Sequence, residues 1–171
     1  MKKAADEEVA VVDSTDITVS GDGTWKTRGH TSQIVACTVI GADTGKVVDV
    51  EVLSKACKGC SRWKGPRLGN AFTKWHARYS QVFTENHIGS SDTMEGDGMV
   101  KLFQRSESER GVCYFNYIGD GDSSTFLSIS ACLQCGENVP LSKVECVVHV
   151  QKRMDSRLRK FKKIWIKKPL R

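Results

Sequence analysis

Apolar and polar residues alternate over residues 17–20 and again over residues 47–53, and a period of two predicts half-buried β-strands at both places. Between them, residues 33–40 form an apolar-rich stretch, and the sequence Ala-Asp-Thr-Gly at 42–45 is typical of a hairpin turn. We therefore expect three antiparallel strands at residues 17–25, 33–40 and 47–53. In the third strand, the valines share one face and the acids Asp49 and Glu51 share the other.

In the second half of the chain, stretches with helical spacing of apolar residues alternate with two further predicted strands. We expect strands at residues 112–118 and 143–149, and helices at residues 94–110, 123–132 and 150–165. In the last helix, Met154, Leu158 and Phe161 recur at i, i+4 and i+7 and form one apolar stripe. The predicted order is three antiparallel strands, helix, strand, helix, strand, helix.

This order indicates one α/β domain with a mixed sheet. A chain of 171 residues is long enough for one such core. We assign residues 1–16 to a polar tail, residues 17–165 to the domain and residues 166–171 to a second tail. Residues 54–93 are an irregular insertion rich in glycine, lysine and aromatic residues, and a loop of that length favours its own organisation or a metal ion.

Charge is distributed unevenly along the chain. The net charge is +6, yet residues 143–171 alone hold eleven Lys and Arg against Glu145 and Asp155, so the other 142 residues sum to −3. A local basic surface suits a polyanion such as DNA, although a solvated basic helix is the commoner meaning of such a run. The candidate DNA-binding residues are Lys152, Arg153, Arg157, Arg159, Lys160, Lys162 and Lys163.

No apolar run approaches the ~20 residues that span a membrane, and the first ten residues lack the apolar stretch of a signal peptide. A soluble protein that is not secreted is the expectation. The seven cysteines then favour metal binding or burial over a disulfide framework. Cys57 and Cys60, in a Cys-x-x-Cys pair, would supply half of a tetrahedral zinc site inside the insertion.

Two acids follow predicted strands. Asp22 stands between Gly21 and Gly23, and we expect these glycines to leave room for a metal ion and a phosphate. Asp120 and Asp122 follow the fourth strand. The predicted element order is that of the ribonuclease H-like fold, in which the fourth strand lies parallel to the first, about 4.8 Å away. Asp22 and Asp120 would then share divalent metal ions, with Asp122 as the alternative to Asp120 and two simple turn residues as the plainer interpretation.

Several long stretches resemble one family. They are residues 16–32, 38–55, 57–60, 86–95, 117–126 and 145–154, which extend over nearly the whole chain from Asp16. In these stretches the chain is similar to the Mutator-like transposases of animal genomes. The resemblance implies a nuclear, cut-and-paste DNA transposase that acts on transposon ends with an Asp-Asp-Glu triad and Mg²⁺ or Mn²⁺, and that could self-associate.

Carried over residue by residue, the resemblance makes Asp22 the first acid and Asp120 the second, and it makes Cys146 and His149 the Cys-x-x-His motif of the family. For the zinc site, Tyr79 and Phe83 stand where the resemblance implies a histidine and a cysteine. The third acid would lie beyond a further helical region, so we expect a truncated and inactive copy. The alternatives are a non-catalytic nucleic-acid-binding module that uses the basic helix, and a different ribonuclease H-like nuclease acting on RNA.

Overall fold

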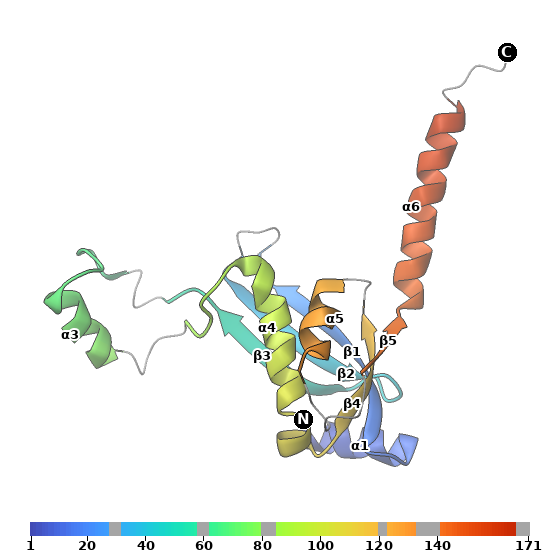
Figure 1. The fold of residues 1–171 in the computed structure, drawn as a ribbon, viewed down its shortest axis with the longest axis horizontal. Helices are drawn as coiled ribbons and strands as arrows, with labels where there is room; N and C mark the ends of the chain where they lie inside the picture. Colours follow the sequence, from blue (N-terminus) through green and yellow to red (C-terminus); the bar gives the residue numbers. More distant parts are fainter. Residues whose placement is uncertain (28–31, 58–61, 80–84, 120–122, 133–140, 167–171) are drawn as a thin grey trace.

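A five-stranded mixed sheet is the centre of the protein in the computed structural model, which describes residues 1–27, 32–57, 62–79, 85–119, 123–132 and 141–166 (Figure 1). The strand order is β3-β2-β1-β4-β5. The first three strands pair antiparallel, and β4 and β5 add to them in parallel. The predicted mixed α/β sheet is confirmed. The strands are β1 Asp16–Trp25, β2 Ile34–Gly41, β3 Val47–Ser54, β4 Cys113–Gly119 and β5 Ser142–Glu145.

The three predicted helices are present and depart from the predictions mainly at their ends, whereas α1 and α3 were not predicted. The predicted helix at 94–110 is two elements, because α4 ends at Gln104 and a π-helical turn, η2, follows and stops at Gly111 with φ 72°. The predicted strand at 143–149 ends at Glu145, and residues 147–149 already belong to α6. The helices are α1 Lys2–Val12, α3 Asn70–Tyr79, α4 Ser91–Gln104, η2 Ser106–Arg110, α5 Ser123–Ser130 and α6 Val147–Ile166.

The hydrophobic core lies between the sheet and α4, with α5 beside α4 on the same face (Figure 1). Phe103 of α4 is fully buried, and its ring lies 5.0 Å from that of Tyr114 and 5.8 Å from that of Tyr117. Both tyrosines belong to β4, so this aromatic contact holds α4 over the strand that leads to Asp120.

The first residues are not the polar tail that the sequence predicted. Residues 2–12 form α1, whose Ala5 and Glu8 are fully buried. The Glu8 carboxylate accepts hydrogen bonds from the backbone N–H groups of Asp43 (2.9 Å) and Thr44 (3.0 Å), and from the Thr44 hydroxyl. Because Glu8 satisfies the donors of the β2–β3 turn, this end of the chain is part of the domain.

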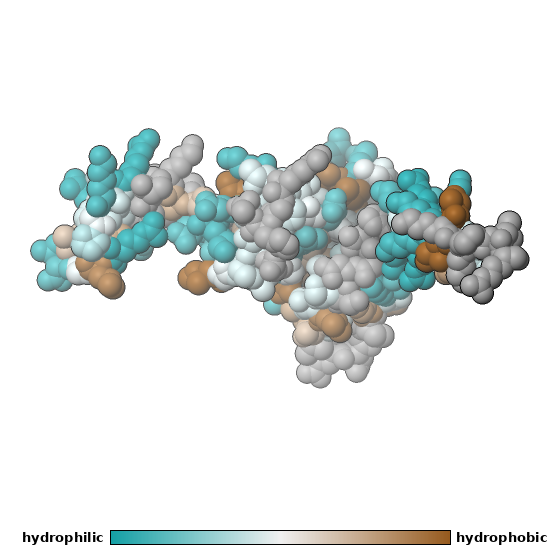
Figure 2. Space-filling view, turned by 90° about the horizontal axis from the view of Figure 1, so that it is seen from above, coloured by the Kyte–Doolittle hydropathy of each residue, from teal (hydrophilic) through white to brown (hydrophobic). Residues whose placement is uncertain are grey.

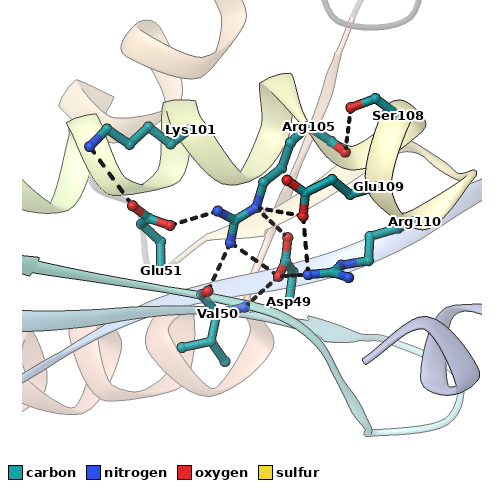
Figure 3. A network of polar contacts seen from close by, with 8 residues as sticks. All are labelled: Asp49, Val50, Glu51, Lys101, Arg105, Ser108, Glu109 and Arg110. Atoms are coloured by element: carbon teal, nitrogen blue, oxygen red, sulfur yellow. Dashed lines mark hydrogen bonds and ion pairs between the residues drawn. The ribbon is translucent and has the colours of Figure 1, made fainter.

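An ion-pair network joins β3 to α4 and η2 (Figure 3). Asp49 is fully buried and accepts from Arg105 through Nε (2.8 Å) and Nη2 (3.1 Å), and from Arg110 Nη2 (2.6 Å). Arg105 Nη1 also reaches Glu51 at 2.6 Å. The acids Asp49 and Glu51 both contact this network, as their predicted common face requires, but the valines do not share one environment, because Val48 is fully buried and Val52 is 50% exposed.

The Asp49 carboxyl group is held in its charged form by this network. Burial by itself would raise its pKa, but the hydrogen bonds from Arg105 and Arg110 outweigh burial and lower the pKa below its usual value. Asp49 therefore holds η2 to the sheet through an ion pair in which its carboxylate is charged at neutral pH.

Two helices lie away from the sheet (Figure 1). In α3 no residue is buried, and in α6 the apolar stripe is open to solvent, since Met154, Leu158 and Phe161 are each about 60% exposed. Within the described parts of the chain, no helix combines the length and the hydropathy that crossing a bilayer requires.

Candidate functional site

The first candidate acid, Asp22, lies on β1 next to the parallel strand β4. The described pairing of these strands ends with Ser20 opposite Ile118, and Gly119 is the last residue of β4. Asp22 follows Ser20 by two residues, and Asp120 follows Ile118 by two residues. Asp120 and Asp122 themselves lie outside the described residues, so their proximity to Asp22 stays a prediction.

Asp22 is exposed on β1. Its Oδ1 accepts from the N–H of Gly23 (2.9 Å), and its backbone carbonyl accepts from the hydroxyl of Thr38 on β2 (3.3 Å). The Asp22 carboxylate is thus accessible, as a metal ligand must be.

Side chains occupy the space beside the two glycines that flank Asp22, whereas the sequence had predicted room for a metal ion and a phosphate. A Cβ on Gly21 would lie 2.7 Å from the Tyr117 ring, and a Cβ on Gly23 would lie 2.6 Å from Cδ of Glu95. The space that these glycines leave is therefore filled by side chains of β4 and α4.

Glu95 is a carboxylate near this site that the sequence did not single out. It belongs to the start of α4, a helix whose N-terminus is capped by the Ser90 hydroxyl accepting from the Thr93 N–H (3.3 Å). Only the docking of α4 on the sheet brings Glu95 over Gly23. No local sequence pattern carries that information.

The charges around the site act on Cys37 of β2. Burial, together with the nearby carboxylates of Glu95, Glu51 and Asp22, raises the pKa of the Cys37 thiol to about 12. Cys37 is fully buried, and with this raised pKa its thiol is protonated at neutral pH, as is usual for a cysteine of the core.

The predicted zinc site is only partly visible. Cys57 is buried, whereas Cys60 lies outside the described residues, as does Phe83. Among the residues that are described, no three His, Cys, Asp or Glu side chains gather closely enough to hold a metal ion. Cys113, at the start of β4, is buried, as expected for the cysteines, but it is also disulfide-bonded, which the sequence did not predict.

The Cys-x-x-His pair lies where β5 passes into α6. The N–H of Cys146 donates to the carbonyl of Gly119 (3.3 Å), and the Cys146 carbonyl accepts from Val150 N–H (3.1 Å). His149 is in the first turn of α6 and not on a strand, as the sequence had predicted. The backbone of Cys146 is therefore hydrogen-bonded to Gly119, the residue that directly precedes Asp120.

The predicted DNA-binding residues all belong to α6. All seven are exposed along the helix. Arg153 pairs with Glu145 (2.6 Å) and Arg159 with Asp155 (2.7 Å). The other five make no ion pair within the described part of the chain, and one shallow groove is lined by Lys152, Arg153, Ser156, Arg157 and Lys160.

Comparison with known proteins identifies a family. The model of a family described as Mutator-like transposase matches residues 1–169. Neither the curated proteins nor the solved structures contain a match to this chain.

Proposed function

This chain belongs to the Mutator-like transposase family, and from that premise we propose that it carries the first two acids of a metal-dependent DNA-cleaving site, Asp22 and Asp120. The observation that carries the proposal is the parallel pairing of β1 with β4, which brings Ser20 opposite Ile118. Each of these residues precedes one of the two acids by the same number of positions. Asp122 remains the alternative second acid.

The strand order supports a ribonuclease H-like assignment of the fold. Three antiparallel strands are followed by two strands that join the same sheet in parallel, beside the first strand. In such a sheet, two acids at corresponding ends of neighbouring parallel strands are about 5 Å apart between backbones, close enough for their carboxylates to share metal ions.

Asp22 fits Mg²⁺ or Mn²⁺ as a ligand, because hard cations prefer exposed carboxylate oxygens and Asp22 offers one on a sheet. A bound pair of such ions would activate a water or a 3′-hydroxyl and stabilise the leaving oxygen of a phosphodiester. The chain's own contribution is to position Asp22, through the β1–β2 pairing and the Thr38 hydrogen bond.

The test compares Asp22→Asn and Asp120→Asn with Asp43→Asn, a matched control at an exposed acid in the β2–β3 turn. We expect Mn²⁺ to raise the melting temperature of the unchanged protein and of the control, and to raise it less in the two site variants. Equal Mn²⁺ stabilisation in all four proteins would overturn the proposed site. Cleavage of hairpin DNA and of an RNA–DNA hybrid, measured in parallel, tests the predicted inactivity and separates a transposase from an RNA-directed nuclease.

A non-catalytic nucleic-acid-binding function is favoured by one observation, the exposure of α6 with five cations that have no ion-pair partner within the described residues. Such binding would persist without divalent metal and weaken steeply with salt. The variant Arg157→Gln/Lys160→Gln/Lys163→Gln should then lose most of its affinity for DNA, and unchanged affinity would remove this function. Nuclear location, zinc binding and self-association stay predictions.

A further inference from the structure

The insertion contains a small aromatic cluster of its own. Around α3, the ring of Trp63 lies 5.0 Å from that of Trp75 and 5.7 Å from that of Phe72, and the Trp75 ring lies 5.6 Å from that of Tyr79. Trp63 also donates its indole N–H to the carbonyl of Pro66 (3.1 Å). These contacts fold residues 62–79, here named the aromatic module, around their own rings and not onto the sheet.

The aromatic module is strongly basic. No Asp or Glu occurs between Glu51 and Glu85, so its cations have no acid nearby in the sequence. All of these cations are exposed. The charge distribution along the chain predicted a basic surface at residues 143–171 alone, and the aromatic module is a second basic segment. The cations of the module are Arg62, Lys64, Arg67, Lys74 and Arg78.

These cations also have no carboxylate partner in three dimensions. Within the described residues, none of the five forms an ion pair, in contrast to Arg105 and Arg110, which bind Asp49. Five unpaired cations on one small unit repel each other, and this repulsion is relieved when a polyanion binds. The ring contacts fold the short segment that carries all five cations.

The location of the module leaves it open to a large ligand. In Figure 1, α3 lies at one end of the molecule and α6 lies towards the other, with the sheet between them. Figure 2 shows hydrophilic side chains over the α3 end. A ligand bound there would meet a surface distinct from α6.

We propose that the aromatic module binds the phosphodiester backbone of a nucleic acid, as a second contact surface besides α6. Phosphates would neutralise the exposed cations, and Tyr79, which is 42% exposed with the Arg78 guanidinium 6.0 Å from its ring centre, offers a face on which an unpaired base can stack. The inference deepens the proposed function and rests on it only for the identity of the nucleic acid as DNA.

Fluorescence anisotropy with the full chain and labelled DNA tests this surface. The buffer contains EDTA, so that the result does not depend on the metal site. The module variant is Lys74→Gln/Arg78→Gln, and its matched control is Lys2→Gln/Lys3→Gln, which removes the same charge from exposed positions of α1. Circular dichroism confirms that each variant is folded.

Affinity for DNA falls as salt rises, and we expect the slope of log affinity against log salt to become less steep by about 1.8 in the module variant, at about 0.9 for each phosphate that is no longer neutralised. In the control the slope should stay unchanged. Equal reductions of the slope in the two variants, or none in either, would overturn the proposal. The proposal would also be overturned if substitution of the α6 cations alone abolished DNA binding and the module variant bound DNA as tightly as the unchanged protein.

Two further measurements identify the ligand. Tyr79→Ala should weaken binding of single-stranded DNA more than that of duplex DNA, because only unpaired bases stack on the ring. Polyglutamate that binds as tightly as DNA would show an acidic protein partner and would also overturn the proposal. If Asp22→Asn leaves the Mn²⁺ effect unchanged while the module variant still binds DNA more weakly, the proposed function fails and this inference stands.

Discussion

Gly98 of α4 lies directly against Cys37 of β2. A Cβ on Gly98 would be 2.4 Å from the Cys37 sulfur and 3.2 Å from its Cβ. Cys37 is fully buried, and its thiol also contacts the Glu95 carbonyl of α4 at 3.7 Å. The close approach of helix and strand at this pair sets how near the whole start of α4, including Glu95, comes to β1.

Substituting Gly98→Ala should therefore destabilise the protein by about 1–3 kcal/mol, because the added methyl group overpacks the core. The matched control is Gly96→Ala in the same helix, where the nearest atom, Ser128 Oγ, is 3.5 Å from the added Cβ. This control should stabilise by about 0.5–1 kcal/mol, as alanine favours helices over glycine. Urea unfolding measures both, and a double variant with Cys37→Ala should recover part of the stability. Equal effects of the two glycine substitutions would contradict the described packing of Gly98 on Cys37.

Removing the buried carboxylate by Asp49→Ala should cost about 3 kcal/mol, since it leaves Arg105 and Arg110 without their shared partner. We take the lower end of the usual range because both arginines are partly exposed. Glu109→Ala is the control. It removes an exposed partner of Arg105 at 3.7 Å and should cost less than about 1 kcal/mol. Comparable destabilisation in the two variants would show that Asp49 is not the centre of the network.

The same carboxylate predicts a pH dependence. The pKa of Asp49 is lowered in the folded protein, so its contribution to stability is complete above the unfolded value of about 3.9 and disappears as pH falls through the folded pKa. The free energy of unfolding of the unchanged protein minus that of Asp49→Asn should be constant from about pH 5 to 7 and shrink below about pH 4. A difference that stays constant at acid pH would mean that Asp49 is not held charged.

Glu8→Ala should destabilise the protein by about 1.5–3 kcal/mol, because three donors of the β2–β3 turn lose a charged acceptor. The neighbouring Glu7 pairs with Lys46 at the surface, and Glu7→Ala should change stability by less than about 1 kcal/mol. Differential scanning calorimetry measures both. A negligible effect of Glu8→Ala would restore the idea of a polar tail at the start of the chain.

Local patterns predicted what depends on local periodicity. The strand expected at residues 17–25 is Asp16–Trp25, and the strand expected at 47–53 is Val47–Ser54, because side chains of a strand alternate between two faces whatever it packs against. The helical end expected at residue 110 is found there, because η2 stops before Gly111, whose positive φ suits glycine. The start of α6 was missed, because the apolar run at 144–150 suits a strand and a helix equally well.

The amino-acid sequence by itself determined the succession of elements, the family resemblance and the acids to examine, since each follows from residues close together along the chain. The tertiary structure decided which residues meet. It brought Glu8 to Thr44, Arg105 to Asp49, and Glu95 over Gly23, contacts that join residues between 36 and 72 positions apart. It also showed that the cations of the aromatic module have no ion-pair partner within the described residues. Such facts depend on how packed helices and strands approach each other, and no periodicity in the chain encodes that approach.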